Sequence, residues 1–139
     1  MTEEGGKTTL DTVHVGMIRI PTDDAEPMRA TISGDGRRIS MRLAHELAIY
    51  PEHRRLVHTG YGLNVPNGYV ALAITDGTLA REQGVVVAGG TKIKVPGDES
   101  ELIVTMQNLS RDPARIAAGT RIFSILLCAC PMIEIEEID

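Results

Sequence analysis

Residues 59–80, TGYGLNVPNGYVALAITDGTLA, decide the fold. Two β-rich runs flank Pro66-Asn67-Gly68, and a proline followed by residues that tolerate a positive φ is typical of a tight turn between strands. The second run ends at Thr75-Asp76-Gly77-Thr78, whose glycine and short polar residues predict a loop. The stretch therefore predicts a hairpin that leads into a loop, at a place where a functional loop would be expected.

Short strands and turn signals alternate through the rest of the chain from residue 56 onward, which favours an all-β sandwich or barrel. Pro96-Gly97-Asp98 predicts a second hairpin turn. Residues 13–20 alternate apolar and polar side chains and predict a strand, whereas residues 21–38 are rich in Asp, Pro and Gly and predict a loop. Residues 39–50 fit both a helical stripe and two short strands joined by a turn. Periodicity leaves these two interpretations open.

Composition limits the size and the location of the protein. At 139 residues the chain is long enough for one domain, and we expect residues 1–12 to be a flexible leader and residues 13–139 to be that domain. With no Trp and one Phe, the core must consist mainly of aliphatic side chains and Met. No apolar run is long enough to span a membrane, and the polar N-terminal residues are unlike a signal peptide, so we expect a cytoplasmic protein without membrane contact.

Charge is distributed unevenly along the chain. The net charge of −5 argues against general nucleic-acid binding. Basic residues concentrate between residues 37 and 58, and the last eight residues, MIEIEEID, are acidic. One interpretation is that the two regions are solvated faces of opposite charge. The other is that they form an anion site or a contact between subunits. Cys128 and Cys130 cannot complete a zinc site by themselves, and no metal site is predicted.

Several fragments, taken in order, resemble the homotrimeric dUTPase family and its relatives, the dCTP deaminases. Val65-Pro66 with Gly68-Tyr69 is similar to the family's Pro-x-Gly-Tyr strand, and Leu79-Ala80 followed by residues 84–87 resembles the segment after its phosphate loop. Residues 118–122, AGTRI, resemble its Gly-Asp-Arg-Ile turn. The resemblance covers roughly residues 13–133 and implies a jelly-roll-like β-barrel that forms homotrimers with active sites at subunit boundaries. It also favours strands over a helix in residues 39–50.

The positions that carry the family's chemistry differ in this chain. The family hydrolyses dUTP with a water activated by an aspartate, with Mg²⁺ on the phosphates and with an Arg and Ser from a Pro-Arg-Ser-Gly loop. In this chain that loop reads Thr75-Asp76-Gly77-Thr78, and Lys94 or Val95 takes the place of the aspartate. The first motif resembles residues 39–43, ISMRL, without its aspartate, Ser124 stands where the family has a Gln, and no glycine-rich arm follows the last strand. A phosphate-binding Arg replaced by a carboxylate removes charge neutralisation that phosphoryl transfer needs.

We therefore expect a pseudoenzyme that binds or sequesters a nucleotide or cyclic nucleotide at a cleft between subunits, a role that would suit a viral or mobile-element protein. One alternative is a protein-interaction module, because the acidic segment 132–139 could add as a strand to the sheet edge of a partner or of a neighbouring copy. A second alternative is a diverged dUTP diphosphatase, and only this one would require Mg²⁺, with Asp98 as a weak candidate for the base. No other cofactor is expected. The predicted ligand-binding residues are Thr75, Gly77, Thr78, Arg81, Gly90, Lys92, Lys94, Arg121 and Ser124.

Overall fold

The computed structural model describes residues 12–21 and 26–139, so the predicted leader lies outside the described residues except for Thr12. Within them the chain forms eleven strands and one short helix. In chain order these are β1 (Gly16–Arg19), β2 (Arg29–Ile32), β3 (Arg38–Arg42), β4 (Leu47–Ile49), β5 (Arg54–Asn64), β6 (Tyr69–Thr75), α1 (Gly77–Gln83), β7 (Val85–Val87), β8 (Thr91–Lys94), β9 (Glu101–Asn108), β10 (Ala114–Ile116) and β11 (Arg121–Ala129). No helix in the described part of the chain is long and apolar enough to cross a membrane.

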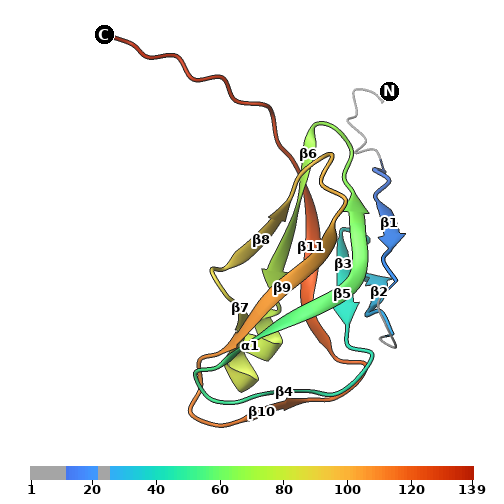
Figure 1. The fold of residues 1–139 in the computed structure, drawn as a ribbon, viewed down its shortest axis with the longest axis vertical. Coiled ribbons are helices and arrows are strands. Elements are labelled where there is room, and N and C mark those ends of the chain that lie inside the picture. The colour runs from blue at the N-terminus through green and yellow to red at the C-terminus, as the bar shows by residue number, and fades with distance from the viewer. Residues whose placement is uncertain (1–11, 22–25) are drawn as a thin grey trace.

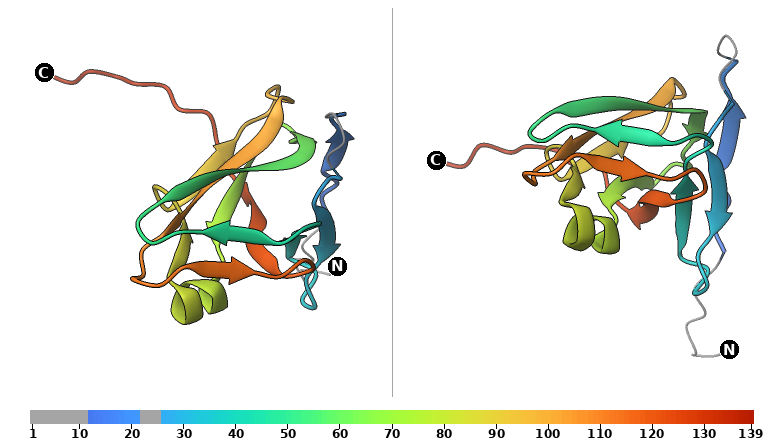
Figure 2. Two further views of the ribbon diagram at one scale, coloured as in Figure 1. Left: turned by 60° about the horizontal axis from the view of Figure 1, so that its bottom comes forward. Right: turned by 90° about the horizontal axis from the view of Figure 1, so that it is seen from below.

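The strands form two main antiparallel sheets that face each other. One has the order β1-β5-β9-β7, the other has the order β2-β3-β11-β6-β8, and β10 and β4 form a separate pair. Figure 1 shows β5 and β9 crossing in front of β6 and β11, and Figure 2 shows the same two layers from other sides. The prediction of an all-β, jelly-roll-like fold is confirmed, although the two sheets are not closed into a continuous barrel.

The core between the sheets is aliphatic, as the composition predicts. The largest fully buried side chains include Phe123, Met41, Met106, Ile122 and Leu63. Complete burial of such a side chain contributes about 1.5–3 kcal/mol to the free energy of folding. Burial alternates strictly along β9, whose even-numbered residues face the core, and this period of two is the pattern of a strand with one buried face.

The turns that looked like hairpins connect different sheets. At Pro66-Asn67-Gly68 the Tyr69 N–H donates to the Pro66 carbonyl at 3.2 Å, and Gly68 has φ 88°, as a tight turn requires. However, β5 belongs to the four-stranded sheet and β6 to the five-stranded one. Residues 96–98 likewise connect β8 to β9 across the two sheets. The prediction of hairpins at these two turns is therefore wrong, because turn chemistry fixes a reversal of direction but not the strand that each arm pairs with.

Two further local predictions are settled by the structure. Residues 39–50 hold β3 and β4, so the helical interpretation is wrong and the two-strand interpretation is confirmed. Residues 21–38 contain β2, which pairs with β3 in register Ile32↔Ile39, so the prediction of a continuous loop is wrong there. This strand was not evident from the sequence because it is only four residues long and its neighbours are rich in Pro and Gly.

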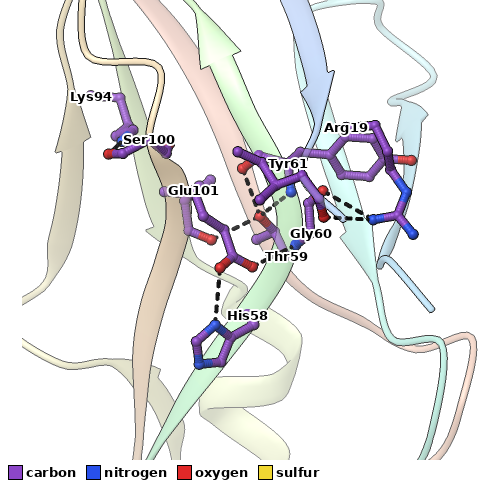
Figure 3. A network of polar contacts seen from close by, with 10 residues as sticks. Arg19, His58, Thr59, Gly60, Tyr61, Lys94, Ser100 and Glu101 are labelled. Atoms are coloured by element: carbon purple, nitrogen blue, oxygen red, sulfur yellow. Dashed lines mark hydrogen bonds and ion pairs between the residues drawn. The ribbon is translucent and has the colours of Figure 1, made fainter. Parts of the chain in front are cut away.

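The long strand β5 bends at a bulge opposite β9. Its register shifts between His58 and Gly62, and the Thr59 hydroxyl donates to the Leu102 carbonyl at 2.7 Å across the bulge. Gly60 has φ 81°, and a Cβ there would lie 2.9 Å from the Cβ of Pro27, so a side chain cannot be accommodated. The backbone N–H of Gly60 donates a hydrogen bond to the carboxylate of Glu101, which also contacts His58 (Figure 3). The bulge lets one strand follow the curvature of the sheet.

Candidate functional site

The loop predicted at Thr75-Asp76-Gly77-Thr78 is the junction of β6 and α1. β6 lies between β11 and β8, so its last residue emerges near the centre of the five-stranded sheet. The Thr75 hydroxyl accepts a hydrogen bond from the Val87 N–H at 3.0 Å, which ties the junction to β7. Asp76 is the N-cap of α1, and Gly84 ends the helix in the left-handed conformation with φ 69°. The prediction of a loop is wrong from Gly77 onward, where the helix begins.

Asp76 makes two interactions from a largely buried position. One carboxylate oxygen accepts the Leu79 N–H at 2.9 Å, and the other accepts Nε of Arg121 at 2.7 Å. The Asp76 residue is 7% exposed, whereas the Arg121 side chain is 35% exposed. The Asp76 carboxylate therefore already binds both the backbone N–H at the start of α1 and the guanidinium of Arg121. An external anion at this junction would compete with Asp76 for these two groups.

A second ion pair holds the turn that follows β8. The ammonium of Lys94 donates to the carbonyl of Ser100 at 2.9 Å and to its hydroxyl at 3.0 Å, and it lies 3.1 Å from Asp98. Figure 3 shows Lys94 and Ser100 together. The Lys94 side chain is only 3% exposed, so its charge is compensated within the chain rather than by solvent.

Asp98, the weak candidate for a catalytic base, lies on the surface of this turn. Hydrogen bonds from Ser100 and Lys94 lower the pKa of Asp98 from its ordinary value of 3.8 to about 2. A general base is most effective when its pKa lies near the working pH, and a carboxylate with a pKa near 2 is a weak proton acceptor. The geometry gives Asp98 the role of compensating the charge of Lys94.

Five of the predicted ligand-binding residues lie near one end of the five-stranded sheet. Thr75 is paired with Phe123, two positions beyond Arg121, and Thr91 is paired with Ile74, which brings the Gly90 turn next to the same end. The five are Thr75, Gly77, Thr78, Gly90 and Arg121. Thr75, Gly77 and Thr78 form the rim of the β6–α1 junction, and Arg121 contacts the junction through Asp76.

The other four predicted ligand-binding residues lie elsewhere or are covered. Arg81 is exposed in the last turn of α1. Lys92 is exposed on β8 opposite Ala73, one pair further from the junction than Thr91. Lys94 is buried with its own partners, and Ser124 is buried on β11 opposite Ser40. The structure therefore does not bring all nine residues to one accessible surface.

Two features of the site escaped the sequence prediction. The first is the cap: Asp76 and Gly84, eight residues apart, carry the start and stop signals of a short helix, and these signals were available in the sequence. The second is Ser100 as a partner of Lys94, for which no sequence pattern exists. Within residues 12–21 and 26–139, no three His, Cys, Asp or Glu side chains lie close enough to hold a metal ion.

The chain is similar in sequence to curated deoxyuridine 5'-triphosphate nucleotidohydrolases. It is 32% identical to the protein of Beijerinckia indica over 116 residues, which covers 81% of this chain and 72% of that protein. It is 23% identical to the protein of Chlamydia muridarum over 119 residues, which covers 86% of this chain and 82% of that protein. No family model matches the chain.

Solved structures with the same fold include phage dUTPases. A variant of the Staphylococcus bacteriophage 80alpha dUTPase with dUpNHpp superimposes with a TM-score of 0.76 at 14% identity, covering 92% of this chain and 97% of that one. A variant of the dUTPase from phage phi11 of S. aureus, described with a structural Mg(II) ion, gives a TM-score of 0.74 at 12% identity, covering 91% and 97%. At these identities the superpositions support the fold.

Proposed function

The chain belongs to the dUTPase family, and we propose that it is a member that binds a nucleotide-type ligand at the rim of the β6–α1 junction without hydrolysing it. The observation that carries the absence of hydrolysis in this proposal is the pair formed by Asp76 and Arg121 at 2.7 Å. The family resemblance places a phosphate-binding arginine at this loop. Here the loop supplies a carboxylate, and that carboxylate engages the nearest cation.

The charge at the turn after β8 supports the absence of hydrolysis. The position at which the resemblance expects an activating aspartate is occupied by Lys94 or Val95. An ammonium cannot accept a proton from water, and that of Lys94 is held by Ser100 and Asp98. The low pKa of Asp98 makes it a poor substitute.

Magnesium does not fit the residues at the junction. Both oxygens of the Asp76 carboxylate are engaged, one by the Leu79 N–H and one by Arg121. An oxygen ligand for Mg²⁺ would have to be released from the helix cap or from the ion pair. We therefore derive no catalytic step through a metal ion in this chain.

Binding is tested by the thermal stability of the protein with a panel of nucleotides and cyclic nucleotides. A ligand present at 100 times its Kd adds about 2.7 kcal/mol to the free energy of unfolding, which raises Tm measurably. We expect a rise for at least one nucleotide, reduced by Thr78→Glu, which adds a negative charge at an exposed position of the junction, and unchanged by Arg111→Glu, a control at an exposed loop position. A panel without any shift would contradict the proposal of a nucleotide-type ligand.

A second candidate function is an active, diverged dUTP diphosphatase. The specific observation in its favour is that the similar curated proteins carry that name. Release of pyrophosphate from dUTP with Mg²⁺ distinguishes the two functions. We expect no release above the uncatalysed rate, and sustained release that is lost in Asp98→Asn would replace the first proposal with the second.

The assembly proposed for this chain is the homotrimer that the family resemblance implies. The third function considered, a protein-interaction module, rests on the acidic segment 132–139, whose apolar side chains are exposed. We place that segment in the contact between copies.

A further inference from the structure

We propose that a phosphate group of the ligand binds, without a metal ion, between Arg29 of β2 and Arg42 of β3. We call these two residues the arginine pair. The inference deepens the proposed function, because the identity of the ligand as a nucleotide rests on that function. It assigns the anionic part of the ligand to two residues that the sequence did not predict to bind it.

The register of the five-stranded sheet places three arginines next to one another. Arg29 is paired with Arg42, and Arg42 is paired in turn with Arg121 on β11. Directly paired residues of antiparallel strands project their side chains on the same side of the sheet, with Cβ atoms about 4.5–5.5 Å apart. Three positive charges therefore lie side by side, at the margin of the sheet opposite β8 (Figure 1).

The arginine pair carries positive charge that the described protein groups leave uncompensated. Arg42 donates to two neutral oxygens, the hydroxyl of Thr31 at 3.4 Å and the carbonyl of Gly119 at 3.2 Å. Within residues 12–21 and 26–139, no ion pair involves Arg29 or Arg42. Like charges at directly paired positions lower the stability of a sheet, so an anion bound between the two guanidinium groups would stabilise it.

Arg121 connects the arginine pair to the β6–α1 junction. Its Nε donates to the carboxylate of Asp76 at 2.7 Å, so its charge is already compensated within the chain. A phosphate bound at the arginine pair would lie beside the junction and would not have to displace Asp76. The nucleoside part of the ligand could then lie at the rim of the junction, which Arg121 borders.

The guanidinium group has the chemistry that phosphate recognition requires. It is always charged, and its planar set of N–H donors binds two phosphate oxygens at once. The two hydrogen bonds made by Arg42 fix its position and leave other N–H donors available. Arg42 is half-buried and Arg29 is exposed, so one group is held in place and the other can move toward the anion. Two such groups neutralise a phosphate without a metal ion.

The arginine pair is reached from a hollow at the end of the sheet. The hollow has a volume of about 740 Å³, and Arg29 and Gly119 both line it. Gly119 is the residue whose carbonyl accepts the hydrogen bond from Arg42. Glu26 lines the same hollow and lies 3.3 Å from the imidazole of His45. A ligand can therefore approach the arginine pair from outside the molecule.

The first test measures the affinity for phosphate by isothermal titration calorimetry. The probes are inorganic pyrophosphate and a nucleoside diphosphate, both in the presence of EDTA. We expect both to bind, and Arg42→Gln should weaken both by about tenfold or more. Arg29→Gln should weaken them by about threefold, because an exposed charge contributes less. Arg111→Gln, at an exposed loop position, should have no effect.

The conservative variant separates charge from folding. Arg42→Lys keeps the positive charge without the planar fork and should give an affinity between those of the parent protein and Arg42→Gln. Because Arg29 is exposed, Arg29→Gln remains informative even if Arg42→Gln lowers the stability of the sheet. Affinities unchanged in Arg29→Gln and in Arg42→Gln, or binding that requires Mg²⁺, would overturn the proposal.

The two probes also separate this inference from the proposed function. Pyrophosphate binding that is lost in Arg42→Gln, together with a nucleotide panel that gives no shift in Tm, would support the phosphate site and overturn the nucleotide ligand. A nucleotide that binds with the same affinity to both arginine variants would overturn the phosphate site and leave the proposed function intact.

Discussion

The two ion pairs near the candidate site differ in which partner is buried. At the β6–α1 junction the carboxylate is buried and the guanidinium of Arg121 is half-buried, whereas after β8 the ammonium of Lys94 is buried and Asp98 is exposed. In each pair the buried partner makes additional hydrogen bonds, Asp76 to the start of the helix and Lys94 to Ser100. The comparison teaches that the buried partner organises the backbone and the exposed partner only balances its charge.

The largest effect is expected when the buried carboxylate is removed. Asp76→Ala should lower the free energy of unfolding by about 3 kcal/mol, because it removes a helix cap and leaves Arg121 without its partner. Urea denaturation measures the change. Glu82→Ala, an exposed position in the same helix, should stay within about 0.5 kcal/mol. If the two variants were equally stable, Asp76 would not organise the junction.

The buried ammonium should matter somewhat less. Lys94→Ala should cost about 2 kcal/mol, since it opens a cavity and leaves the Ser100 carbonyl without a donor. Lys94→Met keeps the volume and removes the charge, and its cost should be below about 1.5 kcal/mol. Urea denaturation of both variants separates packing from charge. A methionine variant less stable than the alanine variant would contradict this account.

Removal of the half-buried partner at the junction sharpens the comparison. Arg121→Gln should cost about 1 kcal/mol, less than Asp76→Ala, because the carboxylate keeps the Leu79 N–H and water reaches the vacated side. A double-mutant cycle with Asp76→Asn measures the coupling of the two side chains. A cost for Arg121→Gln above that of Asp76→Ala would reverse the proposed order of importance.

The smallest effect is expected from the exposed carboxylate, and it depends on pH. Because the folded-state pKa of Asp98 is about 2, below its ordinary value of 3.8, its contribution is present above pH 3.8 and is lost as the pH falls toward 2. Asp98→Asn should therefore flatten the dependence of Tm on pH between about pH 4 and pH 2 and leave its slope at pH 6–8 unchanged. A slope in the acidic window identical to that of the parent protein would remove Asp98 as its source.

The strands were largely predictable from the sequence, but their partners were not. Short β-rich runs between Pro and Gly signals correctly predicted β6, β9 and β11. The turn at Pro66 looks the same whether its arms pair with each other or with other strands, because pairing depends on which faces are buried. β2 was missed because it is short, and α1 was missed because residues 75–78 were compared with a loop of the family.

The end of β6 was predictable from the sequence, but the interactions at the junction that follows were not. The sequence predicted a break in the strand at Thr75 and Asp76, and Gly77 does begin the element that follows. The burial of Lys94 could not be foreseen, since lysine is almost always exposed unless a nearby group compensates its charge. That compensation comes from Asp98 and Ser100, whose side chains turn back toward β8 only in the folded chain.

The alternation of successive strands between the two sheets also has a consequence for the rate of folding. Among the described strands, only β2 and β3 are both consecutive in the chain and paired with each other. Almost every native pairing must therefore join segments that are distant in sequence, and the loop-closure entropy must be lost before the contacts form. We therefore expect folding to be slow, on the order of milliseconds to seconds. Of the paired strands, only the β2–β3 hairpin is expected to form early.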